Sequence, residues 1–239
     1  MGKPTPIALF TLGGVVLCWI VFAAVFMLRK RPPKEKEAKR DRLSLLGIFL
    51  QMCAYFLVWF QPPSKPFLPP VAALSGSIGI LVSACTLALA VGSVWLIASA
   101  VRTLGTQWAI AARLVEGHKL ITAGPYRFVR NPIYTGMLGM LVATGLAMEY
   151  WTALIVAFVL FVVGLIIRVR CEEKLLRAAF GQEFEDYAQR VPAVLPGISN
   201  EVFLGFHEGS AAANLANRSQ IVFVSVSKVS PMWLNDARL

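Results

Sequence analysis

Five uninterrupted apolar runs constrain this chain more than any other feature of its sequence. They cover residues 7–28, 43–60, 71–101, 133–148 and 152–167. A helix needs about 20 apolar residues to cross a bilayer, and the first three runs provide them. The last two, of about 16 residues each, need flanking residues to complete a crossing. Only 15% of the residues are charged, against about 25% in soluble domains. The sequence therefore predicts an all-α, polytopic membrane protein with about five transmembrane helices.

Basic residues are concentrated in the connections between these runs. The chain has a net charge of +10, and eight of its 23 Lys and Arg residues lie within residues 29–42. The positive-inside rule places such a loop in the cytoplasm, where lipid headgroups attract its side chains. Residues 102–132 carry five basic residues against one acidic residue, Glu116, which favours the same side. This pattern predicts an external N-terminus, a cytoplasmic C-terminus and no nucleic-acid partner.

The cysteines and histidines predict neither a disulfide framework nor a metal site. Three of the four cysteines lie inside apolar runs, and no two of them form a CxxC pair. The two histidines, His118 and His207, lie far apart in the sequence, which argues against a cluster of metal ligands.

The sequence divides into three regions. Residues 1–100 are expected to be N-terminal transmembrane helices, and residues 101–198 hold most of the polar residues that could carry chemistry. In the second region a charged helix should follow the last apolar run and stop at Gly181, before a short helix over residues 183–187. Residues 199–239 change in composition and form a tail to which no role is assigned.

Residues 133–148 and 152–167 are expected to form a helical hairpin. A hairpin returns the chain to its starting side, so the polar residues that flank its two arms should lie close together. They are Tyr126, Arg130 and Tyr134 before and within the first arm, and Arg168, Arg170, Glu172 and Glu173 after the second. Structural roles are also open to them. Interfacial arginines snorkel and tyrosines form membrane belts, and Asn131-Pro132 is typical of a helix start.

The polar segments match a known set of motifs. The first is Gly124-Pro125-Tyr126-Arg127-x-x-Arg130-Asn131-Pro132-x-Tyr134-x-Gly136, preceded by His118-Lys119-Leu120-Ile121. After the hairpin come Arg168-Val169-Arg170-Cys171-Glu172-Glu173 and a segment containing Phe180-Gly181, Phe184, Tyr187 and Val191-Pro192. Over residues 118–197 the chain resembles the isoprenylcysteine carboxyl methyltransferases and their bacterial relatives.

The resemblance implies S-adenosylmethionine as the methyl donor, held in a cytosol-facing C-terminal pocket. The implied cofactor contacts are His118, Lys119, Leu120, Ile121, Tyr126, Arg130, Asn131, Tyr134 and Glu172. Arg168 matches the position that holds the substrate carboxylate, and Arg168 and Arg130 are the expected catalytic residues. The chain lacks a GxGxxG element after a strand, so a Rossmann site is not expected. The family usually has His where this chain has Asn131, which cannot titrate.

The predicted function is methyl transfer to the carboxylate of a prenylated or otherwise lipophilic substrate that comes from the bilayer. The site would face the cytosol, in a bacterial inner membrane or an endoplasmic-reticulum-type membrane. Three other functions stay open: a phospholipid amine N-methyltransferase, a non-catalytic scaffold or transport subunit, and a membrane reductase on the same helical scaffold. No ionisable residue lies mid-span, where transport pathways usually place them, and this argues against transport.

Overall fold

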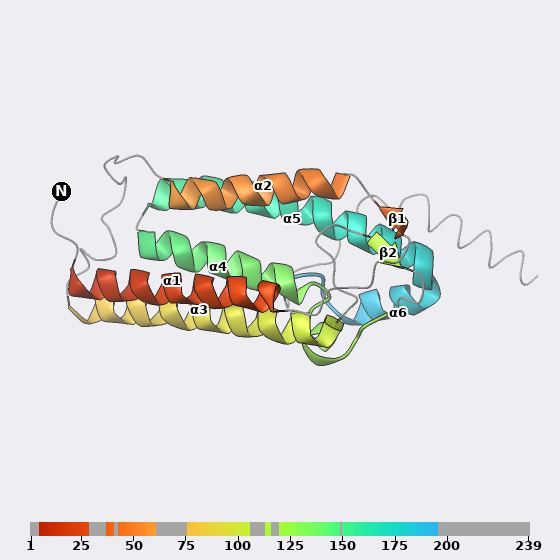
Figure 1. Cartoon of the computed structure of the whole chain (residues 1–239), viewed down its shortest axis with the longest axis horizontal. Helices are drawn as coiled ribbons and strands as arrows, with labels where there is room; N and C mark the ends of the chain where they lie inside the picture. Colours follow the sequence, from red (N-terminus) through yellow and green to blue (C-terminus); the bar gives the residue numbers. More distant parts are fainter. Residues whose placement is uncertain are drawn as a thin grey trace, which may run out of the picture. The chain divides into compact units, whose positions relative to one another are not determined.

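A computed structural model describes residues 5–28, 37–40, 43–60, 76–105, 113–115, 120–148 and 150–195, with the backbone alone for 37–40 and 113–115. Five long helices dominate it: α1 (Pro6–Met27), α2 (Leu43–Trp59), α3 (Ser77–Leu104), α4 (Pro132–Met148) and α5 (Trp151–Phe180) (Figure 1). They confirm the predicted helical architecture. The predicted division at residues 100 and 198 stays a prediction, and the tail lies outside the described residues.

The helices have the length and surface of an integral membrane protein. By length and composition, α1, α3 and α5 can each cross a membrane. The 17-residue helices α2 and α4 are about 25 Å long, slightly less than a hydrocarbon core of about 30 Å. Apolar side chains also cover the outward faces. Phe10 is 73% exposed and Trp95 is 70% exposed, which suits contact with lipid rather than with water.

Helix α4 lies at the centre of the helix packing. It contacts α1, α2, α3 and α5, while α2 runs beside α5 and α1 beside α3 (Figure 1). Two apolar clusters follow from this arrangement. One joins α2, α4 and α5 and includes Tyr55, Leu138 and Phe161. The other joins α1, α3 and α4 and includes Val15, Ile97 and Met140.

Helices α2 and α5 cross closely because glycines face each other. A Cβ atom added to Gly47 would lie 2.7 Å from the carbonyl oxygen of Gly164 and 2.5 Å from Cγ of Arg168. A Cβ atom added to Gly164 would lie 2.7 Å from the carbonyl oxygen of Gly47. Small residues allow two membrane helices to approach in this way, and here they bring Arg168 against α2.

The segment after the hairpin is helical, as predicted. Helix α5 continues past Ile167 to Phe180, and Gly181 ends it with φ of +52°, a conformation that glycine adopts without steric cost. A short helix, α6 (Gln182–Arg190), follows. Before the hairpin, the 3-10 helix η3 (Gly124–Arg127) leads into α4. Helix α3 begins at Ser77, and residues 71–75 of the predicted run lie outside the described residues.

One feature was not predicted from the sequence. Strands β1 (Glu37–Arg40) and β2 (Arg113–Val115) pair antiparallel. The pair ties the basic loop of residues 29–42 to the segment that follows α3. Both strands are too short, and β1 too charged, to show the alternation of apolar and polar residues by which a strand is recognised in a sequence.

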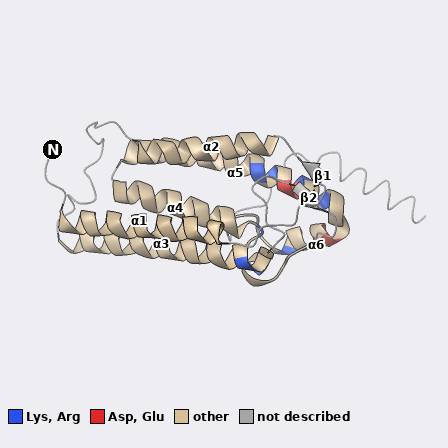
Figure 2. Ribbon diagram, in the orientation of Figure 1, with Lys and Arg blue, Asp and Glu red and all other residues tan. Residues whose placement is uncertain are grey.

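The charged residues of the described chain gather at one end of the helices (Figure 2). Helices α1, α2 and α4 contain none, and α3 contains only Arg102 near its end. All the charges of α5 lie from Arg168 onward. The end of the molecule that holds the predicted site is therefore its polar end.

Candidate functional site

The two arms of the hairpin bring the predicted polar residues together. Arg130, just before α4, pairs with Glu173 of α5 at 2.7 Å, and Tyr134 of α4 donates a hydrogen bond to Glu172. The guanidinium of Arg168 lies 4.6 Å from the centre of the Tyr134 ring. The predicted proximity of these residues is confirmed.

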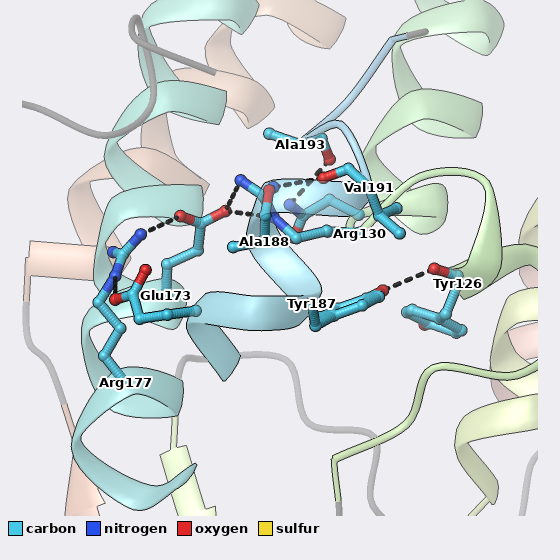
Figure 3. A network of polar contacts seen from close by, with 10 residues as sticks. Tyr126, Arg130, Glu173, Arg177, Tyr187, Ala188, Val191 and Ala193 are labelled. Atoms are coloured by element: carbon cyan, nitrogen blue, oxygen red, sulfur yellow. Dashed lines mark hydrogen bonds and ion pairs between the residues drawn. The ribbon is translucent and has the colours of Figure 1, made fainter. Parts of the chain in front are cut away.

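Arg130 is held by an internal set of partners (Figure 3). Its Nε and Nη2 donate to Oε1 of Glu173 at 3.0 and 2.7 Å. Its Nη1 donates to the carbonyl oxygen of Ala188 at 2.7 Å and to that of Val191. These two carbonyls lie at the end of α6, where a cation also complements the helix dipole. Four of the five N–H donors of this guanidinium are thus satisfied inside the protein.

Glu173 links Arg130 to a second arginine on its own helix. Its Oε2 accepts from Arg177 Nη2 at 3.1 Å, and Arg177 Nε also donates to Glu185 of α6 at 2.8 Å. The side chains of Arg130 and Glu173 are each 2% exposed. Because both oxygens of Glu173 are used and the pair is buried, this network (Arg130, Glu173, Arg177 and Glu185) fastens α6 to the end of α5.

The segment after α6 accepts hydrogen bonds from the residues at the beginning of α4. The backbone N–H groups of Arg130 and Asn131 donate to the carbonyls of Pro192 and Ala193 at 2.9 and 3.0 Å. Asn131 Nδ2 donates to the same Ala193 carbonyl at 2.9 Å, and Thr135 Oγ1 donates to Val194 at 2.6 Å. Helix α4 begins at Pro132 as predicted. The Asn131 side chain therefore contacts this segment.

Two tyrosines join η3 to α6 (Figure 3). The Tyr187 hydroxyl donates to the carbonyl oxygen of Tyr126 at 2.6 Å. Burial raises the pKa of Tyr187 to about 12; Arg130 lowers this pKa and Glu173 raises it. Burial also raises the pKa of Tyr126 well above its ordinary value, with Glu172 and Tyr187 adding to the rise. Both phenols therefore stay protonated at neutral pH.

A second polar cluster lies beside the Arg130 network and is more open. Glu172 accepts from Tyr134 through Oε1, and Nη2 of Arg168 lies 3.8 Å from the same oxygen. The side chain of Glu172 is 27% exposed, whereas that of Glu173 is 2% exposed. The neighbouring glutamates therefore differ in exposure: Glu173 is enclosed, and Glu172 is partly exposed.

Helix α2 contributes one residue to this second cluster. Gln51 Oε1 accepts from Arg168 Nη1 at 3.2 Å, and Gln51 is 2% exposed. Gln51, Tyr134, Arg168 and Glu172 are called the Arg168 cluster below. It joins α2, α4 and α5.

Comparison with known proteins agrees with this fold and these motifs. Residues 78–183 match a family model described as "Phospholipid methyltransferase". Protein-S-isoprenylcysteine O-methyltransferase B of Arabidopsis thaliana is 34% identical over 90 residues, which cover 38% of this chain and 46% of that protein. The nickel-cobalt-cadmium resistance protein NccN of Alcaligenes xylosoxydans xylosoxydans is 34% identical over 121 residues, covering 48% of this chain and 55% of that protein. The chain thus spans about half the length of these curated relatives.

The fold is similar to a solved structure of the eukaryotic intramembrane Ras methyltransferase ICMT (isoprenylcysteine carboxyl methyltransferase). The TM-score is 0.54 at 19% identity, and the match covers 82% of this chain and 70% of that structure. Part of this chain is therefore similar in sequence to isoprenylcysteine O-methyltransferases, and its fold is similar to that of the solved methyltransferase. The relationship expected from the motifs is confirmed.

The predicted site residues divide into three groups. Tyr134, Arg168 and Glu172 form the Arg168 cluster, whereas Arg130 and Asn131 contact the segment after α6. Leu120 is half-buried and packs against the apolar cluster of α6, and Ile121 is half-buried beside it in sequence. His118 and Lys119 lie outside the described residues. The roles given to all of these residues stay predictions.

Two residues that the structure brings into this region, Glu173 and Gln51, are not among the predicted site residues. In the sequence Glu173 cannot be distinguished from Glu172. Only its contacts with Arg130 and Arg177 show that it has a different role. Gln51 was passed over inside an apolar run, although a polar residue in a membrane span is a functional signal by default. That signal was available in the sequence.

Proposed function

We propose that this chain is an integral membrane methyltransferase that uses S-adenosylmethionine to methylate the carboxylate of a prenylated or otherwise lipophilic substrate. The observation that carries the proposal is the Arg168 cluster, in which an arginine and an accessible glutamate lie side by side within the segment that matches methyltransferases. The relatives supply the reaction class, and the cluster supplies groups that suit it.

The residues of the cluster suit the cofactor by their chemistry. S-adenosylmethionine carries an ammonium group, ribose hydroxyls and a sulfonium cation, which need acceptors and benefit from negative charge. Glu172 is a partly exposed carboxylate, and Tyr134 already donates to one of its oxygens. The adjacent Glu173 is saturated by arginines. Of the two glutamates, Glu172 is therefore the one we assign to cofactor binding.

Further cofactor contacts are proposed on the same side of the hairpin. They are three polar residues between the start of η3 and the first turn of α4, namely Tyr126, Asn131 and Tyr134. The four residues 118–121, which precede η3 in the sequence, are the other proposed contacts: His118, Lys119, Leu120 and Ile121. The cofactor supplies an electrophilic methyl group. The chain's own residues bind it, orient the acceptor and exclude water.

Arg168 is proposed to hold the acceptor carboxylate. A guanidinium binds a carboxylate through paired, charge-assisted hydrogen bonds and so fixes its direction. A carboxylate is already ionised and nucleophilic at neutral pH, so the reaction needs no strong general base. A residue in place of the family's usual histidine, such as Asn131, is compatible with this chemistry.

Arg130 is proposed to act by positioning. Its donors hold Glu173 and the end of α6, so it sets the direction from which Glu172 and Tyr134 face the site. Direct contact of Arg130 with the cofactor, and a part for Arg130 in catalysis, stay predictions. We propose the indirect, positioning role for Arg130.

The nearest alternative is methylation of a phospholipid amine, which the description of the matching family model favours. An amine acceptor is cationic or neutral, and a buried arginine at the acceptor position would repel its cationic form. The carboxylate alternative therefore gives Arg168 a direct partner at the acceptor group, whereas the amine alternative would pair it with the phosphate of the lipid headgroup. The basic connections support our proposal that the site lies on the cytosolic side of a bacterial inner membrane or an endoplasmic-reticulum-type membrane.

Calorimetry of the purified protein tests the proposal. We expect S-adenosylmethionine to bind with micromolar affinity and NADPH to give no heat. Binding of NADPH alone would favour the reductase alternative, and binding of neither would favour the scaffold. Arg168→Ala should bind the cofactor within about twofold of wild type and lose methyl transfer to S-farnesyl-N-acetylcysteine. If it transfers methyl groups normally, Arg168 does not hold the acceptor.

A further inference from the structure

Gln51 has a buried amide group that the proposed function does not yet use. Its Oε1 accepts from Arg168, but its Nε2 has no hydrogen-bond partner among the described residues. Burial of a donor without a partner costs free energy, so such groups in proteins call for an explanation. The cost is high in a helix that is otherwise apolar.

The packing of α2 on α5 fixes where this amide lies. Gly47 faces Arg168, and Gly164 faces Gln51: a Cβ atom added to Gly164 would lie 3.2 Å from Cγ of Gln51. The two helices therefore run in opposite directions past each other. A helical side chain leans toward the N-terminus of its helix, so Arg168 leans back toward Gln51. The glycine crossing thus holds the guanidinium and the amide side by side.

The contact with Arg168 also fixes which way the amide of Gln51 points. Because the carbonyl end accepts from the guanidinium, the NH₂ end is the one left over. A guanidinium and an NH₂ group held together offer several N–H donors and a positive charge to one ligand. Among small groups, a carboxylate matches that set, because it is acceptor-only and binds charged donors strongly.

We propose that Gln51 is a substrate-binding residue whose NH₂ group donates to the acceptor carboxylate beside Arg168. The inference rests on the proposed function, since it assumes that the acceptor is a carboxylate. It gives α2 a part in the site, whose other proposed residues lie in α4, in α5 and in the segment from residue 118 to the start of α4. Gln51 and Arg168 together then favour a carboxylate over its ester product, because hydrogen bonds to a charged acceptor are stronger than those to a neutral ester carbonyl.

The experiment compares the binding of S-farnesyl-N-acetylcysteine and of its methyl ester to the full chain in detergent. In Gln51→Met, which keeps the length of the side chain and removes both the NH₂ group and the oxygen that accepts from Arg168, we expect at least a tenfold weaker affinity for the acid. The affinity for the ester and for S-adenosylmethionine should stay within about twofold. Thr86→Val, which also removes a buried polar group but in α3, should bind all three compounds as the wild type does.

A second variant guards against loss of folding in the first. Gln51→Glu keeps an oxygen that can accept from Arg168 and replaces the NH₂ group with a repelling charge, so it should reject the acid and still bind the ester. An unchanged preference for the acid in either variant overturns the inference. If the wild type binds S-adenosylmethionine but not the acid, the carboxylate function itself fails, and the inference fails with it.

Discussion

At the scale of single residues, Glu172 and Glu173 show how adjacent positions on one helix acquire different roles. Successive side chains on a helix point about 100° apart. Glu173 therefore faces Arg130 and Arg177, and Glu172 faces Tyr134 and Arg168. One carboxylate is enclosed by cations and the other is partly open.

The two glutamates should respond differently to the same substitution. Glu173→Gln leaves Arg130 buried without its counter-charge, and removing one partner of a buried ion pair costs about 3–5 kcal/mol. Glu172→Gln can still accept from Tyr134, so the fold should persist while affinity for S-adenosylmethionine falls at least tenfold. Thermal unfolding in detergent and calorimetry measure the two effects. The opposite pattern would exchange the roles of these residues.

Tyr187 predicts a pH dependence at the alkaline end. Its pKa is about 12 in the folded chain and about 10 in an unfolded one. A proton held more tightly in the folded state stabilises it below pH 10, and this contribution disappears as the pH rises from about 10 to 12. The difference in unfolding temperature between wild type and Tyr187→Phe should narrow over that range. A difference that stays constant would mean that the phenol does not titrate with folding.

The residues of the site were predictable to different degrees. Tyr134, Arg168 and Glu172 could be placed together because a hairpin must return its chain to the same side. The separation of Arg130 from the Arg168 cluster could not be predicted. It depends on the carbonyls of Ala188 and Val191, and no sequence pattern indicates which carbonyl an arginine will meet.

At the scale of elements, the crossing of α2 and α5 depends on two glycines. Gly47→Val would place a branched side chain against the carbonyl of Gly164 and the stem of Arg168, both under 3 Å from its Cβ. We expect the helices to separate and stability to fall by about 1–3 kcal/mol, as in overpacked cores. Methyl transfer should fall with it, because Arg168 would move.

A matched control is available in α3. A Cβ atom added to Gly92 has no other atom within 4 Å, so Gly92→Ala should unfold at or slightly above the wild-type temperature. Equal destabilisation by both substitutions would show that glycine is needed for helix flexibility rather than for close packing.

The order and limits of the helices were largely readable from the sequence. Runs of apolar residues marked the five long helices, and Gly181 marked the end of α5 because its backbone takes a conformation that favours glycine. The contacts between helices were not readable. Five apolar helices offer similar surfaces to one another. The pairing of α2 with α5 depends on Gly47 and Gly164, which face each other where the two helices cross.

At the scale of the whole molecule, the polar end of the bundle should face the cytosol. Glu183 lies on the exposed side of α6, so a cysteine there reports the side of the membrane. In a chain with its own cysteines replaced, Glu183→Cys should react with a membrane-impermeant maleimide in inside-out vesicles and not in intact cells. Thr5→Cys, before the opposite end of α1, should react in the reverse pattern. Labelling of Glu183→Cys from outside would invert the topology.

The buried contacts of Arg130 also set an order of events during synthesis. Its carbonyl partners Ala188 and Val191 lie 58 and 61 residues further along the chain. At about 5–20 residues per second, the ribosome delivers them roughly 3–12 s after Arg130. Until then the charge of Arg130 has no place to be buried. A nascent chain that stops before α6 thus keeps this arginine without its carbonyl partners, and the Arg130 network can form only when synthesis has passed α6.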